Sequence, residues 1–543
     1  MRTILIAAAL VALAAAQQSS KTTGSISGTV KDATTGTPLA QVSVYLMGAA
    51  RAETTTDSAG HYTLGGLAPG SHRLVTMGFR SGRLEASKTV TLGPGQDLTS
   101  IDFSIQTYAQ ISGKVLDENK EPVPGRAVYL VGRDYRLGAL QYMYAGVAKT
   151  DDQGAYRMER VTPGRALLLL VQTAPGRLSA VSDAPAEPKL RKKVFPPTYY
   201  PGTAFMDAAQ PLVLRSGERR EGVDFQLSRV PSFCIEGALE AGGAPAALDF
   251  QLGPRRPTSG RLGSSGFYTM MPFGQTSADG KIRVCELTPG DYQLTVSQRP
   301  ANSGDCPPFF GTAQVSLTDQ DVRNIRFDVP PRLPIPAEVV WDGTPPDKPL
   351  DTKISITLEH VTRAPFTGED ESLTAKSSIP GEFNFPGVLA DEYTPTLRGV
   401  PKDLYVKDIT YAGASVLRAP LRVGSAIGNA TLRISLARDG ALVNAKVADK
   451  DGNPIPDSYV LIMPAEASTE AALAAALITG QADQTGVHKT NALAPGKYLV
   501  LASTAPVDMS PESIGKLYQA RTQSKELILA PNANVSVTLS PTL

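Results

Sequence analysis

The sequence predicts an all-β protein of tandem antiparallel β-sandwich modules, about five in number, with a few short helices in insertions. Three observations predict this architecture. A turn–strand–turn unit recurs about every 100 residues, alternating apolar and polar strands flank each copy, and the 543 residues include 49 glycines and 43 prolines. A chain this long exceeds a single core, so several domains are expected. Alternating strands also need a second layer to cover their apolar face.

The recurring unit is clearest at residues 56–70. Asp57 and Gly60 favour a tight turn, because aspartate can accept bonds from nearby backbone and glycine tolerates positive φ. A half-buried strand and the turn Pro69-Gly70 follow. Nine positions separate this glycine from this proline, and the same interval follows Gly154, Gly280 and Gly486. A fifth, degenerate copy begins at Gly381 and has Ala390-Asp391 in place of Pro-Gly. Repetition at a fixed period indicates repeated structural modules.

The strands around each unit define five predicted modules. Modules one to five span residues 24–106, 107–229, 230–329, 337–437 and 438–543, and the fourth is degenerate. The segment 330–336 is rich in proline and is typical of a stiff polyproline linker. Helices are expected in module five at 465–478 and at 511–520, where Ser510 would be the N-cap and proline the first helical residue.

Module two carries two insertions. One is aromatic, and the other contains a short basic run for which we expect a solvated loop, formed by Lys189, Arg191, Lys192 and Lys193.

Charge and hydropathy narrow the function classes. A net charge of +1 argues against a nucleic-acid partner. Residues 1–16 have the positive start, apolar stretch and small-residue end of a secretory signal, so we expect cleavage near Ala16 and a mature chain from about Gln17. No cysteine comes directly after the apolar stretch, so we expect no lipid anchor. No later apolar run approaches the about 20 residues of a spanning helix. We therefore expect a secreted, periplasmic or cell-surface protein without a transmembrane segment in the mature chain.

All three cysteines lie in module three. A disulfide is permitted outside the cytoplasm, and Cys234–Cys285 is the expected pair because both belong to regular elements. Cys306 bonded to either of them, or an intermolecular link, is an open alternative, since spacing does not determine connectivity. The spacing matches no zinc pattern, and we expect no metal.

The order of motifs resembles the carboxypeptidase regulatory-like domain. Its elements are Gly-x-Val, Pro, Val-x-Val or Val-x-Leu, Thr-Asp-x-x-Gly-x-Tyr and Leu-x-Pro-Gly; modules one and two carry it well, three and five partly, four poorly. The resemblance implies a transthyretin-like (prealbumin-like) seven-stranded β-sandwich, grouped with carbohydrate-binding-like folds and pilin B-type repeats, in secreted multi-module bacterial proteins. It implies an accessory role and no peptidase activity, because in true metallocarboxypeptidases a separate domain holds the zinc.

The sequence also lacks the common catalytic motifs. No histidine is followed by glutamate in a zinc-binding pattern, and neither a Gly-x-Ser-x-Gly elbow nor a phosphate-binding glycine loop occurs. We therefore predict no enzymatic activity and no cofactor. The predicted function is that of a spacer, scaffold or adhesion element of the cell envelope, with polysaccharide or other envelope proteins as partners.

The alternative function is carbohydrate binding through exposed aromatic side chains in module two. The candidate residues are Tyr135, Tyr142, Tyr144, Tyr199 and Tyr200. The competing interpretation is that these tyrosines close a satellite core beneath enlarged loops. Glycan binding that is lost on Tyr142→Ala or Tyr199→Ala would favour the carbohydrate-binding alternative.

Overall fold

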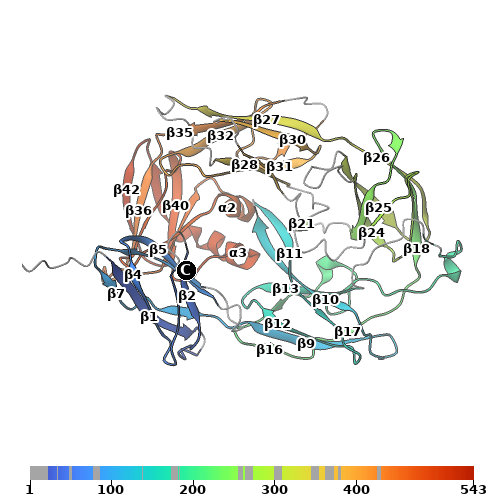
Figure 1. Cartoon of the computed structure of the whole chain (residues 1–543), viewed down its shortest axis with the longest axis horizontal. Coiled ribbons are helices and arrows are strands. Elements are labelled where there is room, and N and C mark those ends of the chain that lie inside the picture. Colours follow the sequence, from blue (N-terminus) through green and yellow to red (C-terminus); the bar gives the residue numbers. More distant parts are fainter. Residues whose placement is uncertain are drawn as a thin grey trace, which may run out of the picture. The chain divides into compact units, whose positions relative to one another are not determined.

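A computed structural model gives two compact units, residues 1–105 and residues 106–543, which are described separately (Figure 1). Within residues 23–543 the structure describes all but 34, 48–51, 78–85, 137, 173–181, 183, 255–260, 263–272, 299–308, 344–353, 361–371, 377–380 and 425–429. The expected leader and Cys306 therefore lie outside the described residues. Among the described residues, no helix is long and apolar enough to cross a membrane.

The described strands form ten sheets in five successive pairs. The first unit holds module one, whose sheets contain β1 (Gly24–Asp32), β4 (His61–Leu67), β7 (Asp97–Leu98) and β8 (Phe103–Ile105), and β2 (Ser43–Met47), β3 (Glu53–Thr55), β5 (Gly70–Met77) and β6 (Ala86–Leu92).

The second unit holds modules two to five. The first sheet of module two contains β9 (Ala109–Leu116), β12 (Ala155–Val161), β16 (Arg219–Arg220) and β17 (Phe225–Gln226). Its second sheet contains β10 (Ala127–Arg136), β11 (Ala139–Lys149), β13 (Ala166–Gln172), β14 (Thr198–Tyr199) and β15 (Leu212–Val213), and β21 (Arg261–Leu262) pairs with β11. Two 3₁₀ turns lie in its insertion, η1 (Pro188–Leu190) and η2 (Met206–Ala208).

Modules three and four repeat the two-sheet plan. Module three has β18 (Phe233–Ala241), β19 (Ala244–Pro245), β23 (Lys281–Leu287) and β26 (Val322–Val329), facing β20 (Asp249–Pro254), β22 (Phe273–Gln275), β24 (Gly290–Ser297) and β25 (Phe310–Leu317). Module four has β27 (Leu333–Trp341), β30 (Glu382–Val388), β32 (Tyr405–Tyr411), β33 (Ala414–Ser415) and β35 (Leu432–Ala437), facing β28 (Ser355–His360), β29 (Ser372–Lys376), β31 (Glu392–Arg398) and β34 (Leu421–Arg422).

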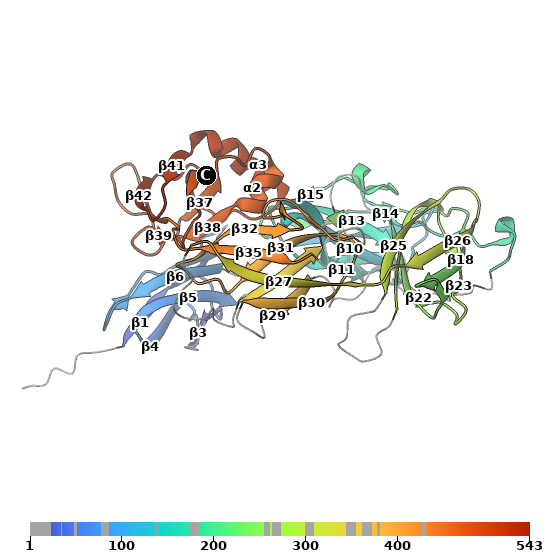
Figure 2. The same cartoon turned by 90° about the horizontal axis from the view of Figure 1, so that it is seen from above.

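Module five carries the two α-helices of the described chain, α2 (Glu470–Ala476) and α3 (Pro511–Ala520), followed by η4 (Arg521–Gln523). Both helices lie together on one sheet (Figure 2), packing on its outer face through Leu473, Ile514 and Leu517. That sheet contains β37 (Tyr459–Pro464), β38 (Ile478–Gln481), β40 (Gly496–Ser503) and β41 (Lys525–Leu529), and the other contains β36 (Leu442–Val447), β39 (Val487–Lys489) and β42 (Asn534–Leu539). These findings confirm an all-β fold with a few short helices.

All five modules share one topology. The last strand of each pairs in parallel with the first, as β8–β1, β17–β9, β26–β18, β35–β27 and β42–β36. We call the glycine that begins each recurring unit the signature glycine; these are Gly60, Gly154, Gly280, Gly381 and Gly486. The first strand also pairs antiparallel with the strand that follows the signature glycine. Each sheet pair encloses its own cluster of buried apolar side chains.

One backbone hydrogen bond recurs at the signature glycine of every module. The glycine carbonyl accepts from a first-strand N–H at 2.7–2.9 Å, in the pairs Val30–Gly60, Val115–Gly154, Leu239–Gly280, Val339–Gly381 and Val447–Gly486. All five glycines have positive φ, between 68° and 88°. A Cβ on any of them except Gly381 would lie within 2.7 Å of a first-strand carbonyl oxygen. Glycine is therefore required both by conformation and by close approach.

A tyrosine hydroxyl donates a hydrogen bond to a backbone carbonyl within each module, in one of two geometries. In modules one and two, Tyr62 and Tyr156 donate to Ile101 O and Val223 O, at 2.5 and 2.6 Å, just before the last strand. In modules three to five, the tyrosine that follows the second turn donates to a carbonyl four residues back, as Tyr292, Tyr393 and Tyr498 do. Buried hydroxyls need such partners, so each module satisfies its tyrosine internally.

The proline-rich segment 330–336 is not a linker, and this prediction is wrong. Strand β27 begins at Leu333 and includes Pro334 and Pro336 in module four. Val339 N–H points to β30, so the backbone nitrogens of Pro334 and Pro336 face the opposite side, toward β35. Pairing with β35 begins only at Ala337, so no donor is needed at either proline. Proline is tolerated at strand positions that need no donor.

The helix predictions have mixed outcomes. Helix α3 begins after Ser510, whose hydroxyl accepts from Ser513 N–H, and Pro511 occupies the first turn as expected. The alanine-rich segment forms a helix over only Glu470–Ala476 and then enters β38 at Ile478. Alanine favours helix locally, but the backbone bonds of β38 to β37 take over its end.

We predict that Gly60→Ala destabilises module one by at least about 2 kcal/mol. Left-handed backbone costs alanine about 1–2 kcal/mol, and the new Cβ would lie 2.7 Å from Val30 O. Hydrogen exchange of module one amides in the full chain measures the loss. Gly65→Ala is the matched control, because no heavy atom lies within 4 Å of that Cβ. Equal exchange in the two variants would contradict the assignment.

Candidate functional site

Two of the candidate sugar-binding tyrosines are buried. Tyr142 and Tyr199 are only 3% and 4% exposed, in a cluster with Tyr129, Val131 and Leu168 on the outer face of the second sheet of module two. Met206 and Ala209 of the inserted segment pack against this cluster. The prediction of exposed platforms is wrong for these two rings, because the insertion needs an apolar face to fold against. The structure thus has the satellite core of the competing interpretation.

The remaining three tyrosines are separated from one another. Tyr200 is half-buried and meets Phe225 edge-on at 5.8 Å. Tyr144 is 38% exposed and lies edge-on to Tyr129 at 6.5 Å. Tyr135 packs against the helical cluster of module five, and its hydroxyl lies 3.3 Å from Glu470. The five rings therefore do not form one stacking surface.

The tip of the β10–β11 hairpin, which we call the clasp, joins module two to module five. It comprises Arg133, Asp134, Tyr135, Arg136 and Gly138. The backbone N–H of Tyr135 donates to Met509 O at 2.6 Å, and its ring packs among the side chains that anchor α2 and α3. A backbone bond plus a packed aromatic ring indicates a specific joint.

Charged groups surround this aromatic contact. Arg133 pairs with Glu512 at 3.1 Å, while Arg165 bridges Asp134 at 3.0 Å and Asp508 at 3.3 Å. Burial raises the pKa of the Asp134 carboxyl, and the neighbouring Arg165 opposes that effect. Half-buried pairs are screened less than exposed ones, so these contacts orient the two modules.

Gly138 shows how closely the clasp approaches α2. Its φ is +74°, and a Cβ there would lie 2.9 Å from Ala475 Cβ and 3.0 Å from Ala471 O. Only glycine fits between the hairpin and the helix without displacement. The small residues of α2 therefore serve as a docking face as well as helix formers.

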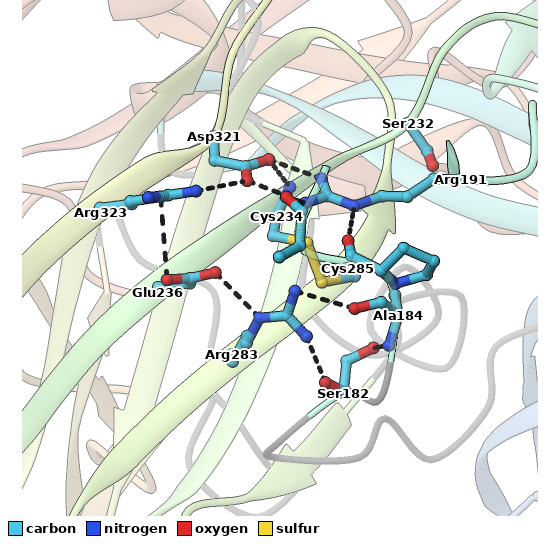
Figure 3. The surroundings of a disulfide bond; sticks show 12 residues. Ser182, Ala184, Arg191, Ser232, Cys234, Glu236, Arg283, Cys285, Asp321 and Arg323 are labelled. Carbon is cyan, nitrogen blue, oxygen red and sulfur yellow. Dashed lines mark hydrogen bonds and ion pairs between the residues drawn. A yellow bond between two sulfur atoms is a disulfide. The ribbon is translucent and has the colours of Figure 1, made fainter. Parts of the chain in front are cut away.

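A second joint holds the other insertion of module two against module three (Figure 3). We call Ser182 and residues 184–191 the strap. Arg191 forms a bidentate ion pair with Asp321, at 2.6 and 2.9 Å, and the two side chains are only 1% and 3% exposed. Two further guanidinium N–H groups donate to Pro185 O and Ala186 O. The planar guanidinium, with its fork of donors, suits such a buried position with several acceptors around it.

The prediction of a solvated basic loop is wrong for Arg191. Lys189, Lys192 and Lys193 are exposed as expected, but Arg191 is buried. The sequence signal was a charge run, which does not distinguish the one cation with a distant carboxylate from its solvated neighbours.

Asp321 is held ionised by several donors. The Arg191 hydrogen bond is the main cause that lowers its pKa to about 2; Cys234 N–H at 2.9 Å and Arg191's charge add to this, whereas burial opposes it. Arg323 lies 3.6 Å away on the other side. The carboxylate is therefore shared by the strap and by β18.

Cys234 and Cys285 are joined by a disulfide beside the strap (Figure 3). It links β18 to β23, the strands that also carry Glu236 and Arg283. Arg283 pairs with Glu236 at 2.9 Å and donates to Ala184 O at 2.9 Å and to Ser182 O. The disulfide thus lies between two groups that contact the strap.

The same residues could suggest a metal site. Ligand atoms of Cys234, Glu236 and Asp321 lie within 4.8 Å of one another. However, the sulfur is bonded to Cys285, and both carboxylates are paired with arginines. Cations already neutralise the donor set, so its chemistry does not fit a further cation.

Three histidine side chains are described, two in the first unit and one in module five. His61 is exposed on β4, and His72 Nε2 lies 2.7 Å from Ala68 O, both in the first unit. His488 lies in module five, where burial lowers its pKa. The described histidines thus occupy packing or surface positions.

Comparisons with known proteins identify module one. Residues 25–106 match the carboxypeptidase regulatory-like domain, which confirms the resemblance there. Colossin-A of Dictyostelium discoideum is 25% identical over 260 residues, which are 44% of this chain and 2% of that protein.

Solved structures that match parts of the chain include a Bacillus anthracis protein and two pilins. The Bacillus anthracis TIE protein matches 92% of this chain and 65% of its own, at 8% identity and a TM-score of 0.13. A streptococcal ancillary pilin matches 57% of this chain and 99% of its own, at 9% identity and a TM-score of 0.16. The minor pilin of Streptococcus agalactiae matches 44% of this chain and 100% of its own, at 14% identity and a TM-score of 0.18. TM-scores this low establish no common arrangement of the modules.

We predict that Tyr142→Ala destabilises module two by about 3–5 kcal/mol, as truncation of a large buried ring does. Tyr144→Ala, the exposed control two residues on, should cost less than about 1 kcal/mol. Denaturant unfolding followed by hydrogen exchange in module two measures both. A Tyr142→Ala variant as stable as Tyr144→Ala would show that the ring is not part of a core.

The Arg191–Asp321 pair predicts a defined pH dependence. Because Asp321 has a folded pKa of about 2 and an ordinary value of 3.8, its contribution is present above pH 3.8 and is lost as pH falls through 2. Asp321→Asn should cost about 3–5 kcal/mol at neutral pH, since Arg191 is left buried and unpaired. The difference from wild type should shrink by about 2 kcal/mol between pH 4 and pH 2. Strap exchange rates measure it, and a pH-independent difference would contradict the assignment.

Proposed function

We propose that this chain is a non-enzymatic extracytoplasmic scaffold whose modules two to five form one rigid body. The clasp carries this proposal, because it joins Arg133 to Glu512 across 379 residues of sequence. Modules that only separated two ends of a molecule would need no such return contact. The exposed loops of a rigid body can instead be held at constant positions for binding envelope proteins or polysaccharide.

Contacts between successive modules support the rigid-body proposal. Phe310 of module three lies in the buried cluster of module four, and Arg332 donates to Gly387 O at 3.1 Å beside it. Between modules four and five, Ala492 N–H donates to Lys402 O at 2.9 Å, and Arg418 pairs with Glu466. The strap joins modules two and three, and the clasp joins modules five and two.

This closed series of contacts distinguishes a scaffold from a spacer. A spacer relies on extension and on joints that move, whereas the contacts of residues 106–543 belong to one compact unit. Arg136 adds a pair with Glu359 of module four at 2.9 Å, so module two contacts three other modules. The contacts therefore favour a scaffold over an extended spacer.

The disulfide supports a location outside the cytoplasm. Disulfides persist in oxidising compartments and are rare in the reducing cytosol. Together with the leader-like residues 1–16, the Cys234–Cys285 bond fits a chain that is exported before or while module three folds. The surface and packing positions of His61, His72 and His488 fit a non-catalytic role.

The test opens the clasp without changing a side chain of any sandwich core. In the full chain, Gly138→Ala combined with Arg133→Ala and Arg165→Ala should increase the radius of gyration measured by small-angle X-ray scattering. The reason is that the new methyl group would displace α2 while the two arginine pairs across the joint are removed.

The matched control is Gly164→Ala with Arg157→Ala and Arg220→Ala. Gly164 also has positive φ, but no heavy atom lies within 4 Å of its Cβ, and both arginines are exposed within module two. The control should keep the wild-type radius of gyration. Equal scattering from both variants would contradict a rigid body closed by the clasp.

A further inference from the structure

The strap is held by a patch on module three that the disulfide crosses. Asp321 precedes β26 and binds Arg191, while Arg283 on β23 binds the strap carbonyls at Ser182 and Ala184. Cys234 and Cys285 link β18 to β23 within this patch. We call the residues of module three that hold the strap its anchor. The anchor depends on the relative position of segments that are distant in sequence.

The disulfide lies at an irregularity in the pairing of β18 and β23. Phe233 is opposite Leu287 and Ile235 is opposite Val284, so two residues of β23 face Cys234 alone. A bulge of this kind interrupts the ladder of backbone bonds. The covalent bond thus holds the two strands together where the ladder is weakest.

The backbone N–H of Cys234, on the edge of β18 that faces β26, is a further donor that the anchor uses. Cys234 N–H donates to Asp321 Oδ1 at 2.9 Å, and the same oxygen accepts from Arg191 at 2.6 Å. Two residues further along, Glu236 is opposite Arg283 in register and pairs with it. Displacement of Cys234 would therefore disturb both sets of contacts with the strap, those made by Asp321 and those made by Arg283.

We propose that the Cys234–Cys285 disulfide locks the anchor of the strap and so makes the joint of modules two and three redox-sensitive. In the oxidised chain the bond holds Asp321, Glu236 and Arg283 at the positions that bind the strap. A dithiol reductant transfers two electrons and two protons to the bond: two thiols form on the protein, and the dithiol becomes a cyclic disulfide. The bulged strands then separate more easily, and the strap is released.

Linkage makes this proposal reciprocal. If the disulfide favours the docked strap by a given factor, the docked strap must stabilise the disulfide against reduction by the same factor. A disulfide that served only the core of module three would show no such coupling, because strap release would not change its reduction equilibrium.

The experiment uses the full chain in a Cys306→Ser background, so that no third thiol can exchange. In the first arm, Cys234→Ser with Cys285→Ser should speed amide exchange in the strap about tenfold, within the 5–150-fold range usual for coupled sites. Amides of α3 in module five serve as the internal reference and should not change.

In the second arm, Arg191→Ala should shift the equilibrium of Cys234–Cys285 with a dithiol buffer about tenfold toward the thiols. Arg422→Ala is the matched control, since its pair with Glu392 is exposed and lies in module four. If the serine variant also exposes β24 and hence unfolds module three, the Arg191→Ala arm alone decides. An unchanged reduction equilibrium in Arg191→Ala overturns the proposal, as does unchanged strap exchange in a serine variant with a folded module three.

Discussion

A single backbone hydrogen bond underlies the whole architecture: the bond from the first strand of each module to the carbonyl of its signature glycine. It sets the register between the first strand and the strand that follows the signature glycine, and that register decides which side chains face the core. The glycine at this point has positive φ and in four modules leaves no room for a Cβ. The bond recurs even at Gly381, where the rest of the motif is degenerate.

The modules could be predicted from sequence because their determinants are local. Turn chemistry at Asp57 and Gly60, strand alternation and the N-cap Ser510 all act within a few residues. The prolines of β27 misled the prediction, because their tolerance depends on β35 starting late, which is a tertiary fact.

The joints could not be predicted, since each depends on partners far away in sequence. Arg191 has its carboxylate 130 residues further on, and Tyr135 enters a cluster from module five. Nothing near either residue signals its partner. The tyrosines of the two insertions of module two serve packing at Tyr142 and Tyr199 and contact between modules at Tyr135. Local rules therefore build the modules, whereas long-range charge and shape complementarity assemble them.

If modules two to five move as one body, the distances between modules two and five must be fixed. Spin labels at the exposed positions Lys149 and Ile528, in the Cys306→Ser chain with the disulfide intact, would give the distribution of one such distance by pulsed electron paramagnetic resonance. We expect one narrow peak in the wild-type background. A broad or multimodal distribution would contradict it, because it would show that modules two and five are joined only by flexible chain.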